Sequence, residues 1–256
     1  MSIVDDLHSY YGDNGILSTS FTCAYKDQCR SDCAEFTGPK SAFVSSRYDD
    51  GTLPRLLFIS LDSGSGDKVD ENRLPDAVRQ FNEFDRDFSS LKKNTHWYIT
   101  HELAWYILRR FDPSLTIEGT RHFFAHANSA KCCMNKPQRK KANLILFRNC
   151  KRYLAEEFEI LRPAIVVTQG KEAKESFLST RPSVRTRLDD FASVVDVGPR
   201  QHFWLHTYHP SNWGAFNTQR AFNEETKQAN GWLHYSDLAY QFVLASERQF
   251  EAEFDL

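Results

Sequence analysis

Four polar side chains stand where apolar, strand-like segments of this sequence end: Asp62, Asn128, Gln169 and His209. In open α/β sheets, ligands bind beyond the carboxyl ends of parallel strands, and such a fold would bring these distant residues together. A carboxylate can position an attacking water molecule, and a histidine can donate a hydrogen bond to developing negative charge. Polar loops also begin at strand ends, where an Asp often only caps the following turn. We predict a catalytic centre containing Asp62, Asn128 and His209.

A second group of residues that could carry chemistry consists of six cysteines: Cys23, Cys29, Cys33, Cys132, Cys133 and Cys150. Free cysteine is often no more than a small buried hydrophobe. The N-terminal residues, however, lack the cationic and apolar regions of a signal peptide, so we expect a cytoplasmic protein. In that compartment, cysteines bind metals more often than they form disulfides. The adjacent pair Cys132-Cys133 also fits poorly with a disulfide framework.

Positive charge is concentrated in the segment that contains Cys132, Cys133 and Cys150. From Lys131 to Arg152 there are eight Lys or Arg residues and no Asp or Glu, although the whole chain has a net charge of −2. The overall charge argues against a protein that coats nucleic acid, whereas a local basic patch beside an active site can contact phosphates. A solvated basic face is the alternative. We predict phosphate contacts by Lys136, Arg139, Lys140 and Lys141.

The elements that must position these residues follow from hydrophobic periodicity. A helix is predicted over 144–161, where Phe147, Cys150 and Phe158 share a face, and Pro163 ends it before a buried strand at 164–168. Further strands are expected at 55–60, 121–127, 194–197 and 202–208, and further helices at 99–111 and 236–248. Residues 67–95 are predicted to be a loop with one helical patch, and residues 211–234 to be polar and loop-like. No window is long and apolar enough to span a membrane. A single domain over 1–256 is expected.

The stretch from Asn128 to Ala173 resembles the iron–sulfur branch of the uracil-DNA glycosylase superfamily. That branch has an Asn-x-x-Lys-Cys segment, a basic loop containing proline, and a second cysteine on a helix that ends at a proline. A Val/Ile-rich strand and a Gly-x-x-Ala turn follow. Here these features are Asn128–Cys132, Cys150, Pro163, 165–167 and Gly170–Ala173. The similarity covers roughly residues 122–178, with shorter matches near 29–64 and 203–213, where His209-Pro-Ser resembles the closing motif of the superfamily.

This resemblance implies a three-layer α/β/α fold with a mostly parallel central sheet. It also implies a 4Fe–4S cluster bound by Cys29, Cys33, Cys132 and Cys150. The branch usually has a Cys-x-x-Cys pair near the N-terminus, whereas this chain offers Cys29 or Cys23 as the partner of Cys33. Zinc would suit four thiolates equally well and is the alternative.

Site roles follow from the same resemblance. The segment Ser60–Gly64 stands where superfamily members carry a motif at the end of the first strand, with Asp62 at the place of a water-activating Asp. The iron–sulfur branch has Glu where this chain has Leu61. His209 would donate to the base, Asn128 would read the pyrimidine edge, and Ser211 of the closing motif would contact DNA.

Aromatic residues are expected to handle the extruded base. The Phe that stacks on the base in related proteins is absent, so Trp97 or Tyr98 is the expected substitute. Trp213 or Phe216, both expected to be exposed, would fill the gap left in the DNA.

The resemblance therefore implies a monomeric DNA glycosylase that releases uracil or a C5-modified pyrimidine from DNA. Strict uracil enzymes carry a Tyr where this chain has Gly64, and Ser63 beside it can bond a polar substituent. One alternative is an antiviral defence enzyme that removes hydroxymethylated or glucosylated cytosine from phage DNA. A non-catalytic iron–sulfur DNA-binding module and a zinc-stabilised hydrolase of another substrate are further alternatives.

Overall fold

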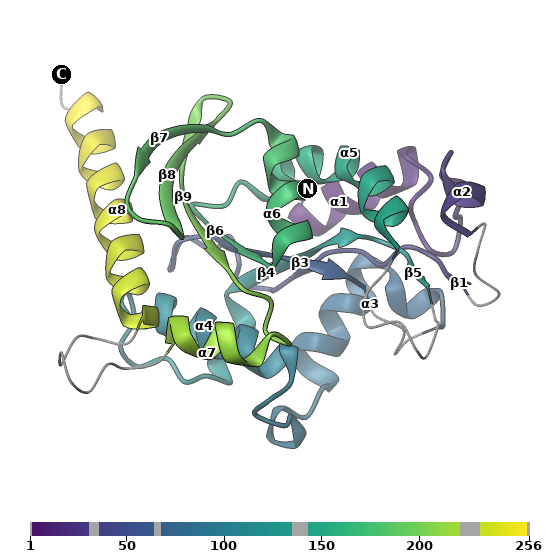
Figure 1. Cartoon of the computed structure of the whole chain (residues 1–256), viewed down its shortest axis with the longest axis horizontal. Helices are drawn as coiled ribbons and strands as arrows, with labels where there is room; N and C mark the ends of the chain where they lie inside the picture. Colours follow the sequence, from purple (N-terminus) through teal and green to yellow (C-terminus); the bar gives the residue numbers. More distant parts are fainter. Residues whose placement is uncertain (1, 31–35, 64–67, 135–142, 221–230, 255–256) are drawn as a thin grey trace.

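A mostly parallel β-sheet forms the middle layer of the computed structural model, which describes residues 2–30, 36–63, 68–134, 143–220 and 231–254 (Figure 1). Its strands are β2 (Phe43–Val44), β3 (Leu56–Asp62), β4 (Phe124–Ala130), β6 (Ile165–Gln169), β7 (Ser183–Arg187), β8 (Ala192–Val197) and β9 (Arg200–Thr207). Their order across the sheet is β2-β4-β3-β6-β9-β8-β7. The central four strands are parallel, and the strands at both edges pair antiparallel. A separate antiparallel pair joins β1 (Phe36–Thr37) to β5 (Cys133–Met134).

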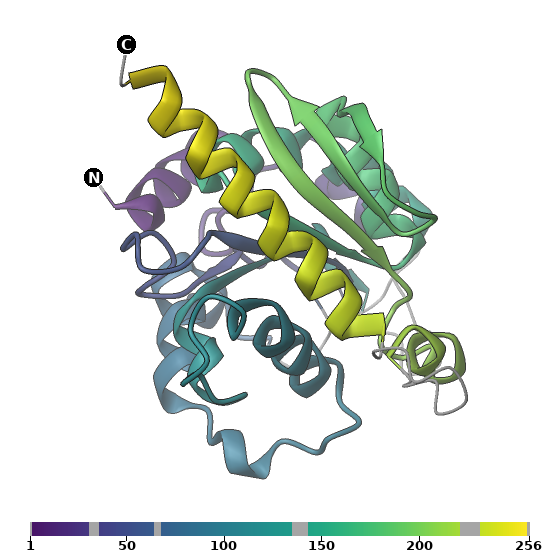
Figure 2. The same cartoon turned by 90° about the vertical axis from the view of Figure 1, so that its left-hand side faces the viewer.

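Helices cover both faces of this sheet. The longer ones are α1 (Ile3–Asp13), α4 (His96–Leu108), α5 (Leu144–Leu161), α7 (Trp213–Arg220) and α8 (Gly231–Phe254), and the shorter ones are α2 (Lys26–Arg30), α3 (Pro75–Gln80) and α6 (Lys171–Phe177). One buried cluster joins α1, α5 and α6 to side chains such as Leu57 and Ile59 of β3. A second joins α3, α4, α7 and α8 to Leu56 and Phe58 on the opposite face. Figure 2 shows the long α8 crossing one side of the molecule. The predicted three-layer α/β/α fold is confirmed.

Short turns of helix connect the main elements. A 3-10 turn spans Glu71–Arg73, a π-helical turn spans Phe81–Asp85, and further 3-10 turns span Phe88–Ser90, Gly119–His122 and Leu178–Thr180. None of the helices in the described ranges is long and apolar enough to cross a membrane.

The predicted bounds of α5 are confirmed at both ends. Asn143 caps the helix through a side-chain bond from the amide of Ile145, and Arg162 ends it in the left-handed region just before Pro163. Cys150 lies on its buried face, as the helical spacing indicated.

Other predicted bounds were wrong. β4 begins at Phe124 instead of residue 121, because Gly119–His122 forms a 3-10 turn. The strand ends at Ala130 instead of residue 127, so Asn128 lies inside it and not after it. Helix α4 begins at His96, because the Thr95 hydroxyl caps it. Residues 211–234, predicted to be loop-like, contain α7 and the start of α8, whereas α3 lies within 67–95, where one helical patch was predicted.

Candidate active site

A cavity of about 420 Å³ opens at the carboxyl end of the central sheet. Its walls come from β3, β4, the start of α4, the segment around Lys40, and the chain that follows β9. Asp62, Asn128 and His209, the three residues predicted to be catalytic, all line it. The parallel pairing of β3 with β4 sets Ser60 beside Asn128 and Asp62 beside Ala130. The sheet thus brings together residues that are up to 147 positions apart in the sequence.

His209 is held in one tautomer. The backbone N–H of Ser211 donates to its Nδ1 at 3.1 Å, and the hydroxyl of Ser211 lies 2.6 Å from the same atom. Because Nδ1 accepts these bonds, the ring proton is on Nε2. Burial lowers the pKa of His209 to about 4, although the nearby carboxylate of Glu172 opposes this shift. His209 is therefore a neutral hydrogen-bond donor at physiological pH.

Gly170 makes room for this histidine. It links β6 to α6 with a φ of +99°, and a Cβ at this position would lie 3.1 Å from the Cβ of His209. Few residues other than glycine adopt such a backbone conformation. The Gly-x-x-Ala turn thus brings the end of β6 close to the chain that carries His209.

A hydrogen-bonded chain crosses the floor of the cavity. Nε2 of His126 lies 2.9 Å from the Ser60 hydroxyl, which donates to Oε1 of Gln169 at 2.6 Å. Since the serine proton is committed to Gln169, His126 must donate to the serine oxygen. Burial lowers the pKa of His126 well below its usual value, and the neighbouring His96 and then nearby lysines add to this effect. Gln169, predicted at a strand end, therefore supports the floor.

His96 is a further histidine of the cavity wall. Its ring lies over His209, and burial lowers its pKa to about 3, with a further contribution from His209 and an opposing hydrogen bond to Gln169. Its Nε2 is buried and has no hydrogen-bond partner within the described residues. Neither His96 nor His126 was predicted from the sequence. For His126 a signal existed, because a residue two positions before Asn128 shares its face of the strand.

The aromatic predictions divide. Trp97 lines the cavity and meets the ring of His126 edge-on, with centroids 5.3 Å apart. Tyr98 is not part of the cavity wall and lies against Phe88 instead, because the next position on α4 points elsewhere. Phe216 was expected to be exposed, and this was wrong: it is fully buried and its ring lies 4.9 Å from that of Trp232. The side chain of Trp213 lies outside the described part of the structure.

The other predicted contacts have mixed positions. Ser63 lines the cavity, and its hydroxyl accepts a bond of 2.7 Å from the buried Arg73. The hydroxyl of Ser211 contacts His209, and the residue is exposed, so its predicted contact with DNA stays a prediction. Gly64 and the basic residues Lys136, Arg139, Lys140 and Lys141 lie outside the described residues. Lys40 and Arg86 bring positive charge to the cavity and had no sequence signal.

Buried thiols gather beside the cavity. Cys29 and Cys132 share an apolar cluster with Leu146, and the backbone N–H of Lys131 donates to the Cys150 sulfur at 3.4 Å. Burial raises the pKa of the Cys132 thiol, and repulsion from Cys150, Cys29 and Cys23 raises it further. The thiol of Cys23 contacts the Tyr153 hydroxyl at 3.1 Å.

The thiols are not arranged as a complete metal site. Among the described residues, no three His, Cys, Asp or Glu side chains are close enough to hold a metal ion. Cys33 lies outside these residues. The chemistry of the donors fits a cysteine-bound cluster. Buried thiolates repel one another, and a bound cation would offset this repulsion and stabilise the ionised form.

The chain is similar in sequence to one known protein family. The family model of the uracil DNA glycosylase superfamily matches residues 78–234, more than half of the chain. No curated protein sequence matches. The matched range includes Asn128, His209, Cys132 and Cys150, whereas Asp62 and Cys29 lie before it.

Proposed function

The chain belongs to the uracil DNA glycosylase superfamily, and we propose that it hydrolyses the N-glycosidic bond of uracil or of a C5-modified pyrimidine in DNA. Water attacks C1′ of the deoxyribose, the bond to N1 of the base breaks, and the base leaves with the bonding electrons. The products are an abasic site and, after protonation, the free base. The observation that carries this proposal is the meeting of Asp62, Asn128 and His209 in one cavity at the carboxyl end of the sheet.

The charges of the reaction match these side chains. Negative charge grows on the base oxygen, and the Nε2–H of the neutral His209 donates to it. Positive character grows on the sugar, where the carboxylate of Asp62 positions the water. Asn128 is 7% exposed and makes no side-chain hydrogen bond with the described residues, so its amide is available for the pyrimidine edge.

The base must leave the duplex before it reaches this cavity. Unstacking costs a few kcal/mol, and one aromatic contact recovers about 1–3 kcal/mol. Trp97, which lines the cavity together with Phe43, supplies this contact in our proposal.

A modified pyrimidine is the substrate that the surroundings favour over plain uracil. A second cavity of about 780 Å³ shares Lys40, Ser63 and Arg86 with the first. A polar substituent at C5 that extends from the base would meet these donors. Hydroxymethylated or glucosylated cytosine of phage DNA has such a substituent, and its removal would make this a defence enzyme.

We further propose a 4Fe–4S cluster, as in the iron–sulfur branch of the superfamily. Cys29, Cys132 and Cys150 would hold it together with Cys33. Cys29 is preferred over Cys23, because Cys29 shares the buried cluster of Cys132 whereas Cys23 contacts Tyr153. A bound cluster would supply cross-links between α2, the end of β4 and α5. Zinc at the same thiolates is distinguished by visible absorption of the purified protein.

The decisive experiment is single-turnover formation of abasic sites. The substrates are matched oligonucleotides with one uracil, cytosine, 5-hydroxymethylcytosine or glucosylated 5-hydroxymethylcytosine. His209→Ala should slow cleavage by about 10²–10³-fold, the loss typical of an oxyanion donor. The matched control is His234→Ala, which removes a half-exposed histidine of α8. Absence of cleavage of every substrate would favour the non-catalytic DNA-binding alternative.

Substrate choice needs a second comparison. Arg86→Gln should reduce cleavage of the glucosylated substrate more than cleavage of uracil, because Arg86 stands between the two cavities. An equal effect on both substrates would contradict the role of the second cavity.

A further inference from the structure

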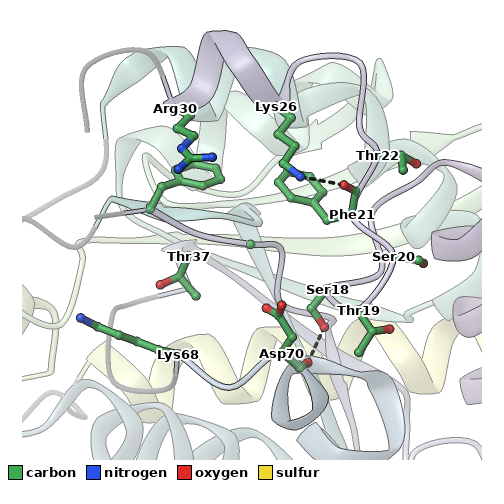
Figure 3. Close-up of a pocket in the computed structure, with 12 residues that line it drawn as sticks. Ser18, Thr19, Ser20, Phe21, Thr22, Lys26, Arg30, Thr37, Lys68 and Asp70 are labelled. Atoms are coloured by element: carbon green, nitrogen blue, oxygen red, sulfur yellow. Dashed lines mark hydrogen bonds between the residues drawn. The ribbon is translucent and has the colours of Figure 1, made fainter. Parts of the chain in front are cut away.

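A third cavity, of about 670 Å³, lies at the N-terminal segment of the chain, away from the residues proposed to be catalytic. It is formed by residues 18–22, the helix α2, the strand β1 and the segment 68–70 (Figure 3). No part of the proposed glycosylase reaction uses these residues, and all of them precede the range matched by the family model.

The cavity is positively charged. Lys26 and Arg30 point into it from α2, Lys68 reaches it from the opposite side, and Asp70 is the one carboxylate among the described lining residues (Figure 3). These three cations and one carboxylate give the described lining a net charge of +2 at neutral pH. Arg30 makes no hydrogen bond or ion pair that the described residues account for, so its guanidinium is available to a ligand.

The walls of the cavity contain hydroxyl-bearing residues and a pair of stacked aromatic rings. Thr22, Thr37 and the hydroxyl-bearing residues 18–20 line the cavity, and the Ser18 hydroxyl donates to the carbonyl of Asp70. The rings of Phe21 and Phe36 stack with centroids 6.2 Å apart and planes inclined by 20°. Lys26 is held against these rings, because its ammonium donates to the Phe21 carbonyl at 3.0 Å and lies 4.9 Å from the Phe21 ring.

This combination suits a phosphodiester. Arginine, lysine and the hydroxyls of serine and threonine are the side chains that contact the phosphates of nucleic acids. A planar guanidinium and a fixed ammonium can neutralise one phosphate, and hydroxyls can donate to its remaining oxygens.

The cavity also lies at the right place for the backbone of bound DNA. Gly38 is part of its wall, and Lys40 is part of the wall of the catalytic cavity. Two residues of extended chain span at most about 7 Å. Successive phosphates of one strand rise by about 3.4 Å along the helix axis, so the two walls are separated by a few nucleotides at most.

We propose that this cavity binds a backbone phosphodiester of DNA within a few nucleotides of the base held in the catalytic cavity. Arg30, Lys68 and Lys26 neutralise the phosphate, and Asp70 limits the affinity. The inference rests on the proposed function only in taking DNA as the ligand. It requires that the protein binds DNA and not that the protein removes a base from it.

The test is the salt dependence of binding to an unmodified duplex, measured by fluorescence anisotropy with the complete protein. Each lost phosphate contact flattens the plot of log K against log salt by about 0.9. Arg30→Gln combined with Lys68→Gln should weaken binding and flatten this slope. The matched control is Arg187→Gln, an exposed arginine of β7 at the far edge of the sheet.

Asp70→Asn gives an effect of opposite sign. It removes the opposing carboxylate with almost no change of shape, so it should tighten binding. Circular dichroism and thermal melting establish that each variant is folded. An unchanged slope in the double variant, or no tightening in Asp70→Asn, would overturn the proposal.

Two further arms identify the source of the phosphate. One set of duplexes is shortened on one side of the target base, and a second set is shortened on the other side. Only one of the two sets should abolish the effect of the double variant. If inorganic phosphate binds at Arg30 while DNA binding is unchanged by the variants, the cavity holds a free anion and the proposal fails. Cleavage is measured separately, so an inactive protein that shows the expected slopes would refute the proposed function alone.

Discussion

The imidazole of His96 stacks on that of His209, with centroids 5.0 Å apart and ring planes inclined by 25°. This contact shields one face of the proposed donor from water, and burial is the main cause of the low pKa of His209. A ring that keeps water out thus also keeps His209 neutral.

We therefore predict that His96→Ala changes the pH dependence of cleavage. Water entering the gap should raise the pKa of His209 from about 4 toward its ordinary value of 6.5. The acid limb of the single-turnover rate, which follows protonation of the donor, should move to higher pH. His96→Phe keeps the ring and should retain the wild-type profile. Identical profiles for wild type and His96→Ala would show that His96 has no such role.

The buried histidines should also make stability depend on pH. Burial places the pKa of His209 near 4 and that of His126 well below 6.5. Between pH 6.5 and about 4 the unfolded chain therefore binds more protons than the folded protein, and the free energy of unfolding falls as the pH falls.

For His126 the loss is up to about 1.4 kcal/mol per pH unit in this window. Urea unfolding of wild type and His126→Gln at pH 7, 6 and 5 measures it. The variant should show a weaker pH dependence, because the glutamine does not titrate. The same dependence in both proteins would mean that His126 does not control it.

The sequence predicted the site better at its strand ends than around them. Asp62 and His209 follow apolar runs whose period is unambiguous, and the parallel sheet then brings them together. His96 was missed because it lies beside the cavity only through the packing of α4, which no local pattern encodes. Phe216 was misplaced because polar residues surround it in the sequence and no apolar periodicity marks its buried face. The cap at Asn143 and the stop at Pro163 made α5 predictable at both ends.

Loss of one thiol should test the proposed cluster. Cys150→Ser removes a buried proposed ligand, so purified protein should lose iron, visible absorption and thermal stability. Cys133→Ser is the matched control, because Cys133 is equally buried but its thiol points toward Asp62 at 3.9 Å. Wild-type iron content in Cys150→Ser, measured by a colorimetric assay, would remove Cys150 from the ligand set.

A buried ion pair on the inner face of α5 links this helix to α1 and to the residue that follows β4. The ammonium of Lys131 and the hydroxyl of Tyr11 both donate to the carboxylate of Glu157. Lys131 is 2% exposed and Glu157 is fully buried. Glu157→Gln would leave a buried cation without its counter-charge, which typically costs about 3–5 kcal/mol.

Urea unfolding should show that loss for Glu157→Gln. Glu159→Gln, two residues further along α5, is the control, since Glu159 is 47% exposed and pairs with Arg200 at the surface. Surface pairs contribute about 0–1 kcal/mol. Similar losses in the two variants would contradict the central role of the buried pair.

Gly170 allows the contribution of backbone strain to be separated from that of the active-site contact. Gly170 and Gly51 both have positive φ, at +99° and +79°. A methyl group at Gly170 would meet the Cβ of His209 at 3.1 Å, whereas one at Gly51 would meet nothing within 4 Å. Both alanine variants should therefore lose about 1–3 kcal/mol of stability from backbone strain. Only Gly170→Ala should also lose cleavage activity, because only its methyl group displaces the proposed donor. Urea unfolding and single-turnover cleavage of the same preparations measure the two effects, and equal activities in the two variants would show that the close approach of Gly170 does not position His209.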